Sequence, residues 1–327
     1  MINKAKKKSL KGWIGLVILV GIVAVLFINR VFVKDFFRAI SYTPSEEMKQ
    51  IREGLELTSN GEFIFNASRP TLSDRDSFNE DCALVKDEST AVLGCYVDEN
   101  IYVYNIVQDE LAGVRELTAA HELLHAVWER LDEVERIDLL KLLEPVLAEH
   151  RDLIGEEVEI YDEAKRNEEL YVRAGTEIKN LPLELEKHYE RVFKNQDKIV
   201  GYYDSYNKVF RELKEENERL SKEVTELKER YNASSEEYSS RVNKLKTDIE
   251  EFNNCAAIAG CFGSQWEFNV KRAELLGERD SLNTLYEEIT RLVDEINAKV
   301  EKHNQNAIYG KKLHQVMNSS VQVEENL

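Results

Sequence analysis

Two long stretches of regularly spaced apolar residues occupy the last third of the chain. In the first stretch, apolar or aromatic side chains recur at alternating intervals of three and four residues, with Asn217 at one inward position. This is the heptad pattern of a coiled coil. Its members are Phe210, Leu213, Leu220, Val224, Leu227 and Tyr231, followed by Tyr238, Val242, Leu245, Ile249 and Phe252. One additional four-residue step near Tyr238 predicts a stutter, at which the supercoil locally unwinds.

A second stretch of similar length follows. Its members are Phe268, Leu275, Leu282, Leu285, Ile289, Leu292, Ile296 and Val300. Each stretch covers roughly 40 residues, or about 60 Å of helix, and the segment 253–265 between them contains two cysteines and two glycines. We therefore expect an antiparallel coiled-coil hairpin with its tip at 253–265. A parallel dimer formed through one arm is the alternative.

Residues 61–107 carry patterns typical of β-strands. Polar and apolar residues alternate over Glu62–Phe65, and the segments 90–97 and 101–107 are rich in Val, Ile and Tyr. Asp98–Asn100 separates the last two segments and predicts a hairpin turn. Because the pattern is helical from about Glu110 nearly to the end, the predicted fold class is α+β.

An apolar run near the start of the chain indicates a membrane anchor. No charged residue interrupts Gly12–Ile28, and five lysines precede it. A bilayer needs about 20 apolar residues, so we expect one transmembrane helix over 12–33, with Arg30 reaching the headgroups. A cleaved signal peptide is the alternative, but no small-x-small cleavage site follows. The basic tail 1–11 should stay in the cytoplasm and the rest of the chain should lie outside.

The composition narrows the possible partners. The chain has 62 Asp and Glu against 44 Lys and Arg, which gives a formal net charge of −18. Such an acidic body offers no basic surface to neutralise phosphates, and this excludes nucleic acid as the expected partner. Gly (14 residues) and Pro (4 residues) are scarce, so collagen-like and Pro/Gly-rich disordered chains are excluded as well.

The four cysteines form two local pairs, Cys82 with Cys95 and Cys255 with Cys261. In an oxidising exterior, an even number of cysteines at short separations predicts two disulfides. Zinc ligation and free buried thiols are the alternatives.

The segment Thr118–Val127 carries the candidate chemistry. His121 and His125 are four residues apart, so on a helix they share one face and can reach one metal ion. Glu122 follows the first histidine and can take a proton from a water molecule at that ion. The alternatives are a histidine pair in a helix core without metal, and a structural metal site, which would normally recruit four protein ligands.

This segment resembles the zincin metallopeptidases of the glutamate-ligand type, over residues 111–175. The resemblance implies one Zn²⁺ ion and a third ligand on a later helix, where Glu169 best matches and Glu168 is the rival. The third histidine of metzincins is absent. The resemblance also implies a small domain with a short β-sheet and active-site helices. One strand before the metal helix should pair with the substrate backbone, and its expected residues are Ile101, Val103 and Asn105.

The predicted organisation follows from these patterns. Its parts are a basic tail (1–11), a transmembrane helix (12–33), a connector (34–60), a zincin-like domain (61–180), the hairpin (181–318) and a C-terminal tail (319–327). The expected function is a membrane-anchored zinc peptidase that hydrolyses a peptide or protein outside the membrane, with Glu122 as general base. The alternative is an envelope scaffold that binds a protein partner through its hairpin, with a non-catalytic zincin-like domain.

Overall fold

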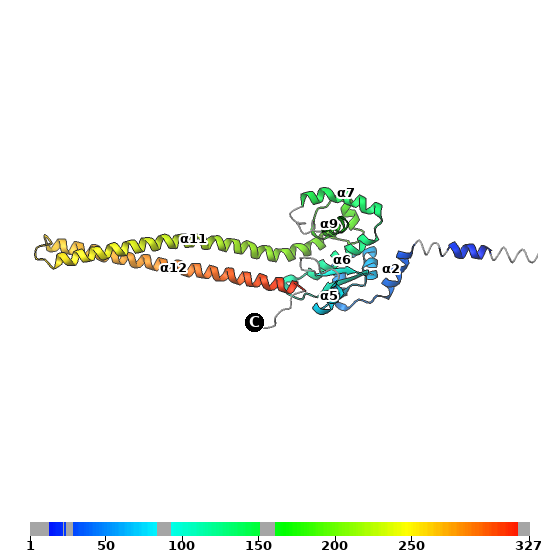
Figure 1. The fold of residues 1–327 in the computed structure, drawn as a ribbon, viewed down its shortest axis with the longest axis horizontal. Coiled ribbons are helices and arrows are strands. Elements are labelled where there is room, and N and C mark those ends of the chain that lie inside the picture. Colours follow the sequence, from blue (N-terminus) through cyan, green and yellow to red (C-terminus); the bar gives the residue numbers. More distant parts are fainter. Residues whose placement is uncertain (1–12, 22, 24–28, 84–92, 151–160, 320–327) are drawn as a thin grey trace, which may run out of the picture. The chain divides into compact units, whose positions relative to one another are not determined.

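The computed structural model describes residues 13–21, 23, 29–83, 93–150 and 161–319, and Figure 1 shows the arrangement of helices and strands. The chain separates into two compact units, one formed by Met1–Val209 with His314–Leu327 and the other by Phe210–Leu313. A small three-stranded sheet and many helices make up the first unit, and a long helical hairpin makes up the second. The predicted α+β class with an added hairpin is confirmed at this level.

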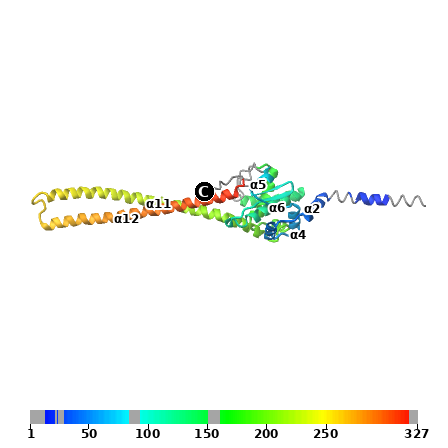
Figure 2. The same cartoon turned by 90° about the horizontal axis from the view of Figure 1, so that it is seen from below.

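Two helices, α11 (Gln196–Ala256) and α12 (Gln265–Met317), form the hairpin and run antiparallel (Figures 1 and 2). Polar pairs join them at successive levels: Glu216 with Asn306 at 3.0 Å, Glu223 with Lys299, and Arg241 with Glu278 at 2.8 Å. Partner numbers fall on α12 as they rise on α11, which defines the antiparallel direction. Predicted seam residues are buried between the arms: Leu220, Leu227, Leu245, Leu282 and Leu292.

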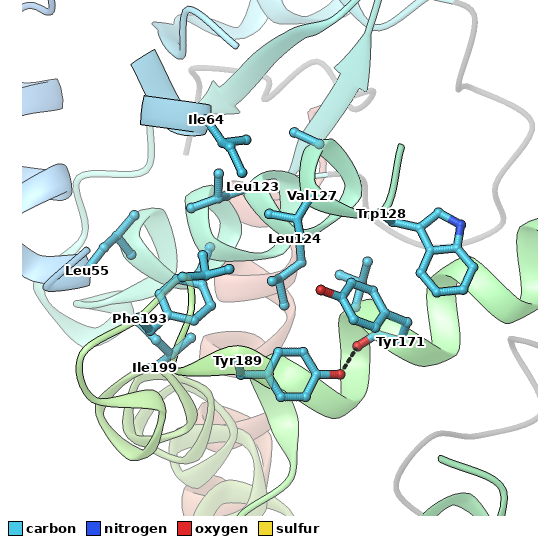
Figure 3. Close-up of a cluster of buried hydrophobic side chains, with 14 of the residues drawn as sticks. Leu55, Ile64, Leu123, Leu124, Val127, Trp128, Tyr171, Tyr189, Phe193 and Ile199 are labelled. Carbon is cyan, nitrogen blue, oxygen red and sulfur yellow. Dashed lines mark hydrogen bonds between the residues drawn. The ribbon is translucent and has the colours of Figure 1, made fainter. Parts of the chain in front are cut away.

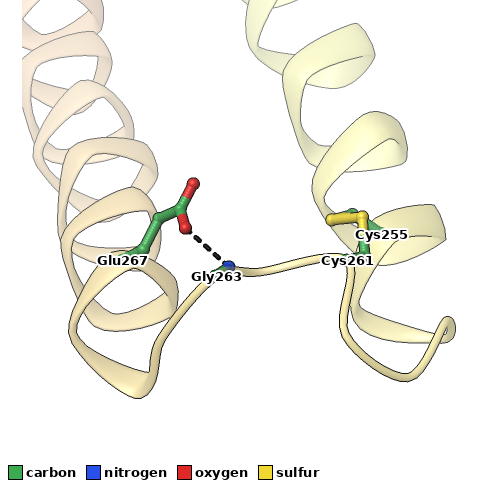
Figure 4. The surroundings of a disulfide bond; sticks show 4 residues. All are labelled: Cys255, Cys261, Gly263 and Glu267. Atoms are coloured by element: carbon green, nitrogen blue, oxygen red, sulfur yellow. Dashed lines mark hydrogen bonds between the residues drawn. A yellow bond between two sulfur atoms is a disulfide. The ribbon is translucent and has the colours of Figure 1, made fainter.

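The tip of the hairpin is closed by the predicted Cys255–Cys261 disulfide (Figure 4). Gly260 has a φ of +77°, a left-handed conformation that favours glycine. Gly263 donates its backbone N–H to the Glu267 carboxylate at 2.7 Å, which satisfies a free donor just before α12. Three aromatic rings, Phe252, Phe262 and Phe268, pack within the same tip.

The sheet of the first unit contains β1 (Thr71–Ser73), β2 (Gly94–Val97) and β3 (Asn100–Tyr104) in the order β1-β3-β2. β1 pairs with β3 in parallel, and β2 pairs with β3 in antiparallel register. Asp98 and Glu99 have φ values of 50° and 63°, as a two-residue hairpin turn requires. The predicted turn is confirmed.

The predicted strand at Glu62–Phe65 is wrong, because these residues belong to the helix α4 (Ser59–Ala67). The Thr58 hydroxyl caps this helix by accepting the Gly61 N–H at 3.1 Å. Ile64 and Phe65 are buried against the core. Four alternating residues are too few to distinguish a strand from a helix, and the capping residue decides the outcome.

The other helices of the first unit are α2 (Arg30–Ser41), α3 (Glu46–Leu55), α5 (Arg75–Asp81), α6 (Val114–Arg130), α7 (Glu133–Glu149), α9 (Glu163–Glu177) and α10 (Leu183–Tyr189), with a 3₁₀ turn at Asp109–Leu111. The helix α6 carries the two histidines and packs on α3, α4 and α9 and on the strands β2 and β3. Leu123 and Leu124 of α6 are fully buried in the core, near Tyr171 of α9 (Figure 3). The Tyr189 hydroxyl donates to the Tyr171 carbonyl at 2.7 Å, which joins α10 to α9.

The globular unit is larger than the predicted range 61–180. Met48, Ile51 and Leu55 of the expected connector 34–60 are 1%, 1% and 0% exposed, at the three- and four-residue spacing of a helix face. At the other end, α10 and Ile199 are also packed in the core. The hairpin unit therefore begins at Phe210 rather than at residue 181. The reason is that apolar residues before position 61 and after position 180 complete the core of the globular unit.

Both predicted disulfides are present. Cys82, which follows α5, is bonded to Cys95 in β2, with 6.0 Å between the two Cα atoms, and both residues are 2% exposed. No cysteine of the chain remains free. Such disulfides are typical of proteins that fold in an oxidising compartment outside the cytoplasm.

The predicted transmembrane helix 12–33 is only partly described. Residues 13–21 are helical and α2 begins at Arg30, whereas residues 12, 22 and 24–28 and the tail 1–11 lie outside the described residues. Within the described part of the chain, no helix combines the length and the apolar character needed to cross a bilayer. The span stays a prediction.

A buried ion pair connects α2 to the last turn of α6. Asp35 is 4% exposed, and its carboxylate accepts two hydrogen bonds from the Arg130 guanidinium, at 2.8 and 2.9 Å. Replacing Asp35 by Asn leaves the guanidinium buried without its counter-charge, so we expect a loss of about 3–5 kcal/mol in the free energy of unfolding.

Urea unfolding followed by tryptophan fluorescence, to which the buried Trp128 contributes, measures this loss. The matched control is Asp138→Asn, which removes an exposed pair with Lys141 on α7 and should change the free energy by less than about 0.5 kcal/mol. Equally small changes in the free energy of unfolding in both variants would contradict a stabilising role of the Asp35–Arg130 pair.

Candidate metal centre

Helix α6 presents His121 and His125 one turn apart on the same face. The opposite face is held in the core by Leu123 and Val127, which are 0% and 5% exposed. The two imidazole rings lie 5.0 Å apart between centroids, and their Nε2 atoms approach to 3.3 Å. The helical spacing and the buried opposite face therefore direct both Nε2 atoms to one point, as the sequence predicts.

Helix α9 brings Glu169 to the same point. Its Oε1 atom lies 3.5 Å from His121 Nε2, and its Oε2 atom lies 3.4 Å from His125 Nε2. Asp162 caps the helix by accepting the Lys165 N–H at 3.0 Å, and buried residues on the far face, among them Tyr171, fix its rotation. Among the described residues, His121, His125 and Glu169 are the group that could hold a metal ion.

The spacing of these donor atoms is compatible with one metal ion. Around zinc, with bonds of about 2.0–2.1 Å, two ligand atoms of a tetrahedron lie about 3.3–3.4 Å apart. The two imidazole Nε2 atoms are 3.3 Å apart, and each has a different oxygen of Glu169 beside it, at 3.5 Å for His121 and 3.4 Å for His125. Two nitrogens and a carboxylate are also ligands that zinc prefers. With one carboxylate oxygen as ligand, the three side chains would leave the fourth corner of a tetrahedron for a water or a substrate atom.

Glu168 occupies a different position from Glu169. Its Oε1 atom lies 2.7 Å from His125 Nδ1, the ring nitrogen that points away from the candidate site. One residue along a helix turns the side chain by about 100°, so the two neighbouring glutamates face different sides of the imidazole. A carboxylate on Nδ1 fixes the ring and leaves Nε2 as the free donor atom for a metal. Of the two predicted ligands, Glu169 therefore faces the site, and Glu168 supports His125 from behind.

Removal of the Glu168 carboxylate gives a test of this support. We expect Glu168→Ala to weaken zinc affinity about 10- to 100-fold without changing the stoichiometry, which is the usual loss for a carboxylate behind a ligating histidine. Competition with a chromophoric chelator measures the affinity. Glu163→Ala, in the exposed first turn of the same helix, is the matched control. An unchanged affinity in Glu168→Ala would show that the hydrogen bond to His125 has no role in metal binding.

Burial and the two glutamates set the protonation of the site. Burial lowers the pKa of His121 to about 4. Burial also lowers the pKa of His125, but hydrogen bonds to Glu168 and Glu169 outweigh it and raise the pKa to about 10. For Glu169, burial raises the pKa, yet His121 and His125 lower it to about 2. At neutral pH the metal-free site therefore carries one proton, on His125.

These pKa values predict the proton release on metal binding. At pH 6 we expect zinc to displace about one proton, from His125, because His121 is already neutral and Glu169 is already ionised. Two histidines with ordinary pKa values near 6.5 would release about 1.5 protons at pH 6, and far fewer at pH 7. Calorimetry in buffers of different ionisation enthalpy measures the number of protons released per zinc bound. A proton release that falls from about 1.5 at pH 6 to far fewer at pH 7, as for two ordinary histidines, would contradict the coupling of His125 to the two glutamates.

The Glu122 side chain extends from α6 toward strand β2. It is only 6% exposed, and it contributes to the raised pKa of His125 through its charge. Gly94 of β2 packs directly on it: a Cβ atom at this glycine would lie 2.7 Å from Glu122 Oε1 and 2.5 Å from Thr118 Cγ2. A larger residue at position 94 would displace the carboxylate, so the glycine permits the close approach of strand and helix.

The predicted substrate strand is wrong. β3 is the central strand and is paired on both sides, so its backbone has no free edge for a substrate, and Ile101 and Val103 are 0% exposed. Asn105 lies beyond the end of β3 and accepts a hydrogen bond from Arg115 at 3.2 Å. Within the described chain, β2 pairs only with β3 and is the strand in contact with Glu122. The residue composition of a strand does not reveal its place in the sheet.

Comparison with protein-family models, with curated proteins and with solved structures finds no match for this chain.

Proposed function

We propose that the protein is a membrane-anchored zinc peptidase whose catalytic unit lies outside the cytoplasm. The observation that carries this proposal is the convergence of His121, His125 and Glu169 around one point, with Glu122 on the same helix as the two histidines. Two histidines and one glutamate with an open fourth position are the ligand set of a catalytic rather than a structural zinc ion. The two disulfides support a site outside the cytoplasm.

The chain's residues would divide the work of peptide hydrolysis among them. A bound zinc ion supplies Lewis-acid polarisation of the scissile carbonyl and acidifies a water molecule. Glu122 acts as general base: it takes a proton from the water that attacks the carbonyl carbon, then delivers it to the amine nitrogen as the C–N bond breaks. Glu168 holds the His125 ring in place throughout.

The substrate we propose is a peptide or protein segment in extended conformation. A cleft of about 1140 Å³ lies beside Glu168, behind His125; Tyr96 and Trp128 contribute to its lining, whereas the three proposed ligands do not. Within the described residues, β2, which contains Tyr96, is paired on one side only, and its other edge offers backbone groups for an added strand. In this proposal β2 takes the role expected of residues 101–107.

The scaffold function remains the second proposal, with the hairpin as the binding part. Ile258 and Trp266 at the hairpin tip are 64% and 74% exposed. Large apolar side chains exposed together often mark protein interaction sites. A protein partner that binds at this tip would require no catalysis by the globular unit.

Metal analysis and a cleavage assay on the purified full-length chain separate the two proposals. We expect one zinc per chain, cleavage of members of a random peptide library, loss of cleavage after chelation, and recovery on addition of zinc. Zinc without cleavage would favour the scaffold. Cleavage that persists after the metal is fully removed would contradict the peptidase proposal.

A further inference from the structure

We propose that helix α2 lies in the surface layer of the membrane, with its outer face in contact with lipid. This inference rests on the membrane anchoring within the proposed function and does not depend on the metal site. The outer face carries large apolar side chains that are 46–63% exposed. They are Val31, Phe36, Phe37 and Ile40. Phe32 is also 60% exposed, but its ring stacks on Phe63 of α4.

Three of the four charged residues of α2 form contacts with other parts of the protein, although the Lys34 side chain stays 55% exposed. Asp35 is 4% exposed and paired with Arg130. Lys34 forms an ion pair with Glu99, and the Arg38 guanidinium donates to the Ala67 carbonyl at 2.7 Å. A helix at the surface of a water-soluble domain has the opposite arrangement, with charges outward and apolar residues inward. Removal of this outer face from water would stabilise the helix through burial of its apolar area.

Lipid is the occupant that the sequence next to α2 favours. Only Asn29 separates the uncharged run Gly12–Ile28 from the first residue of α2. If that run spans the bilayer, α2 must start at the membrane surface, because one residue extends at most about 3.6 Å. Aromatic side chains are enriched at this depth, and an amphipathic helix places its apolar face about 5–10 Å into the headgroup and acyl boundary.

The placement of α2 at the membrane surface also fixes the position of α6 relative to the membrane. α2 packs on α4, and Asp35 joins it to Arg130 in the last turn of α6. Movement of α6 away from the bilayer would break this buried pair. The candidate site is therefore held near the membrane surface by α2 as well as by the anchor.

Spin labels on the full-length chain test the proposal. All four native cysteines are in disulfides, so single cysteines can be introduced by Phe37→Cys and, as a second variant, Ile40→Cys. Glu47→Cys on the exposed side of α3 is the control for water, and Leu19→Cys in the apolar run reports whether the anchor is inserted. In vesicles of phosphatidylcholine and phosphatidylglycerol, the measured quantity is the ratio of collisions with oxygen to collisions with a nickel chelate.

We expect this ratio at positions 37 and 40 to exceed that at position 47 by roughly a factor of three or more, as for side chains within the acyl boundary. Labels at 37 and 40 that resemble position 47, with position 19 in lipid, would overturn the proposal and leave the anchor intact. Spin–spin broadening at 37 that rises with protein density would identify a second copy on this face and overturn it too. A water-exposed label at 19 would contradict the anchor itself, while zinc binding would be unaffected.

Discussion

Replacing Glu122 by Gln should abolish peptide hydrolysis while leaving zinc bound. Gln has nearly the same shape as Glu and can remain packed under Gly94, but it cannot accept a proton from water. A positioned general base contributes about 10²- to 10⁴-fold to the rate, so we expect a loss of that size in kcat/KM. Because Glu122 is not in the group of side chains that could hold the ion, the zinc content should stay at one per chain.

The control for this variant is Glu116→Gln, which makes the same chemical change in the first turn of α6. Its hydrolysis rate should stay close to that of the wild type. Comparison of kcat/KM for both variants on one peptide, with zinc measured in the same samples, separates a lost base from a lost metal. Wild-type turnover in Glu122→Gln would mean that another group takes the proton.

Loss of any one of the three proposed ligands should remove the zinc. His121, His125 and Glu169 each face the common point at 3.3–3.5 Å from another donor atom. Two remaining protein ligands cannot complete a stable site. We therefore expect His121→Ala, His125→Ala and Glu169→Ala to lose zinc during purification, and each should lower affinity by more than the roughly 10- to 100-fold expected for Glu168→Ala.

The comparison of Glu169→Ala with Glu168→Ala is the sharpest part of this experiment. The two residues are adjacent on α9 and have the same chemistry, so differences in helix propensity and charge cancel. Zinc retained in Glu169→Ala and lost in Glu168→Ala would reverse the assignment. Urea unfolding of the metal-free proteins, compared with metal-free wild type, shows whether the loss comes from the site or from misfolding.

The histidine pair and the hairpin could be predicted from the sequence because each depends on local spacing. A four-residue interval places His121 and His125 on one face of a helix whatever surrounds it. Heptad spacing on two arms of similar length similarly predicts an antiparallel hairpin. The disulfides followed from four cysteines in two close pairs. In each case the pattern lies within one element or between neighbours along the chain.

Features that depend on contacts between distant segments were missed or left open. The order of strands places β3 in the centre of the sheet, and the residues of β3 alone do not determine this. The role of Glu168 depends on the rotation of α9 against α6, so the sequence could offer only a choice between two glutamates. The inverted orientation of α2 becomes visible only through the partners of Asp35 and Arg38.

X-ray absorption at the zinc edge tests the central claim most directly. The purified full-length chain should contain one zinc per chain, with two imidazole nitrogens at about 2.0–2.1 Å and carboxylate or water oxygens at about 2.0–2.2 Å. Glu169→Ala should lose this signal. A metal-free protein, or zinc surrounded by a ligand set without the two imidazoles, would contradict the account.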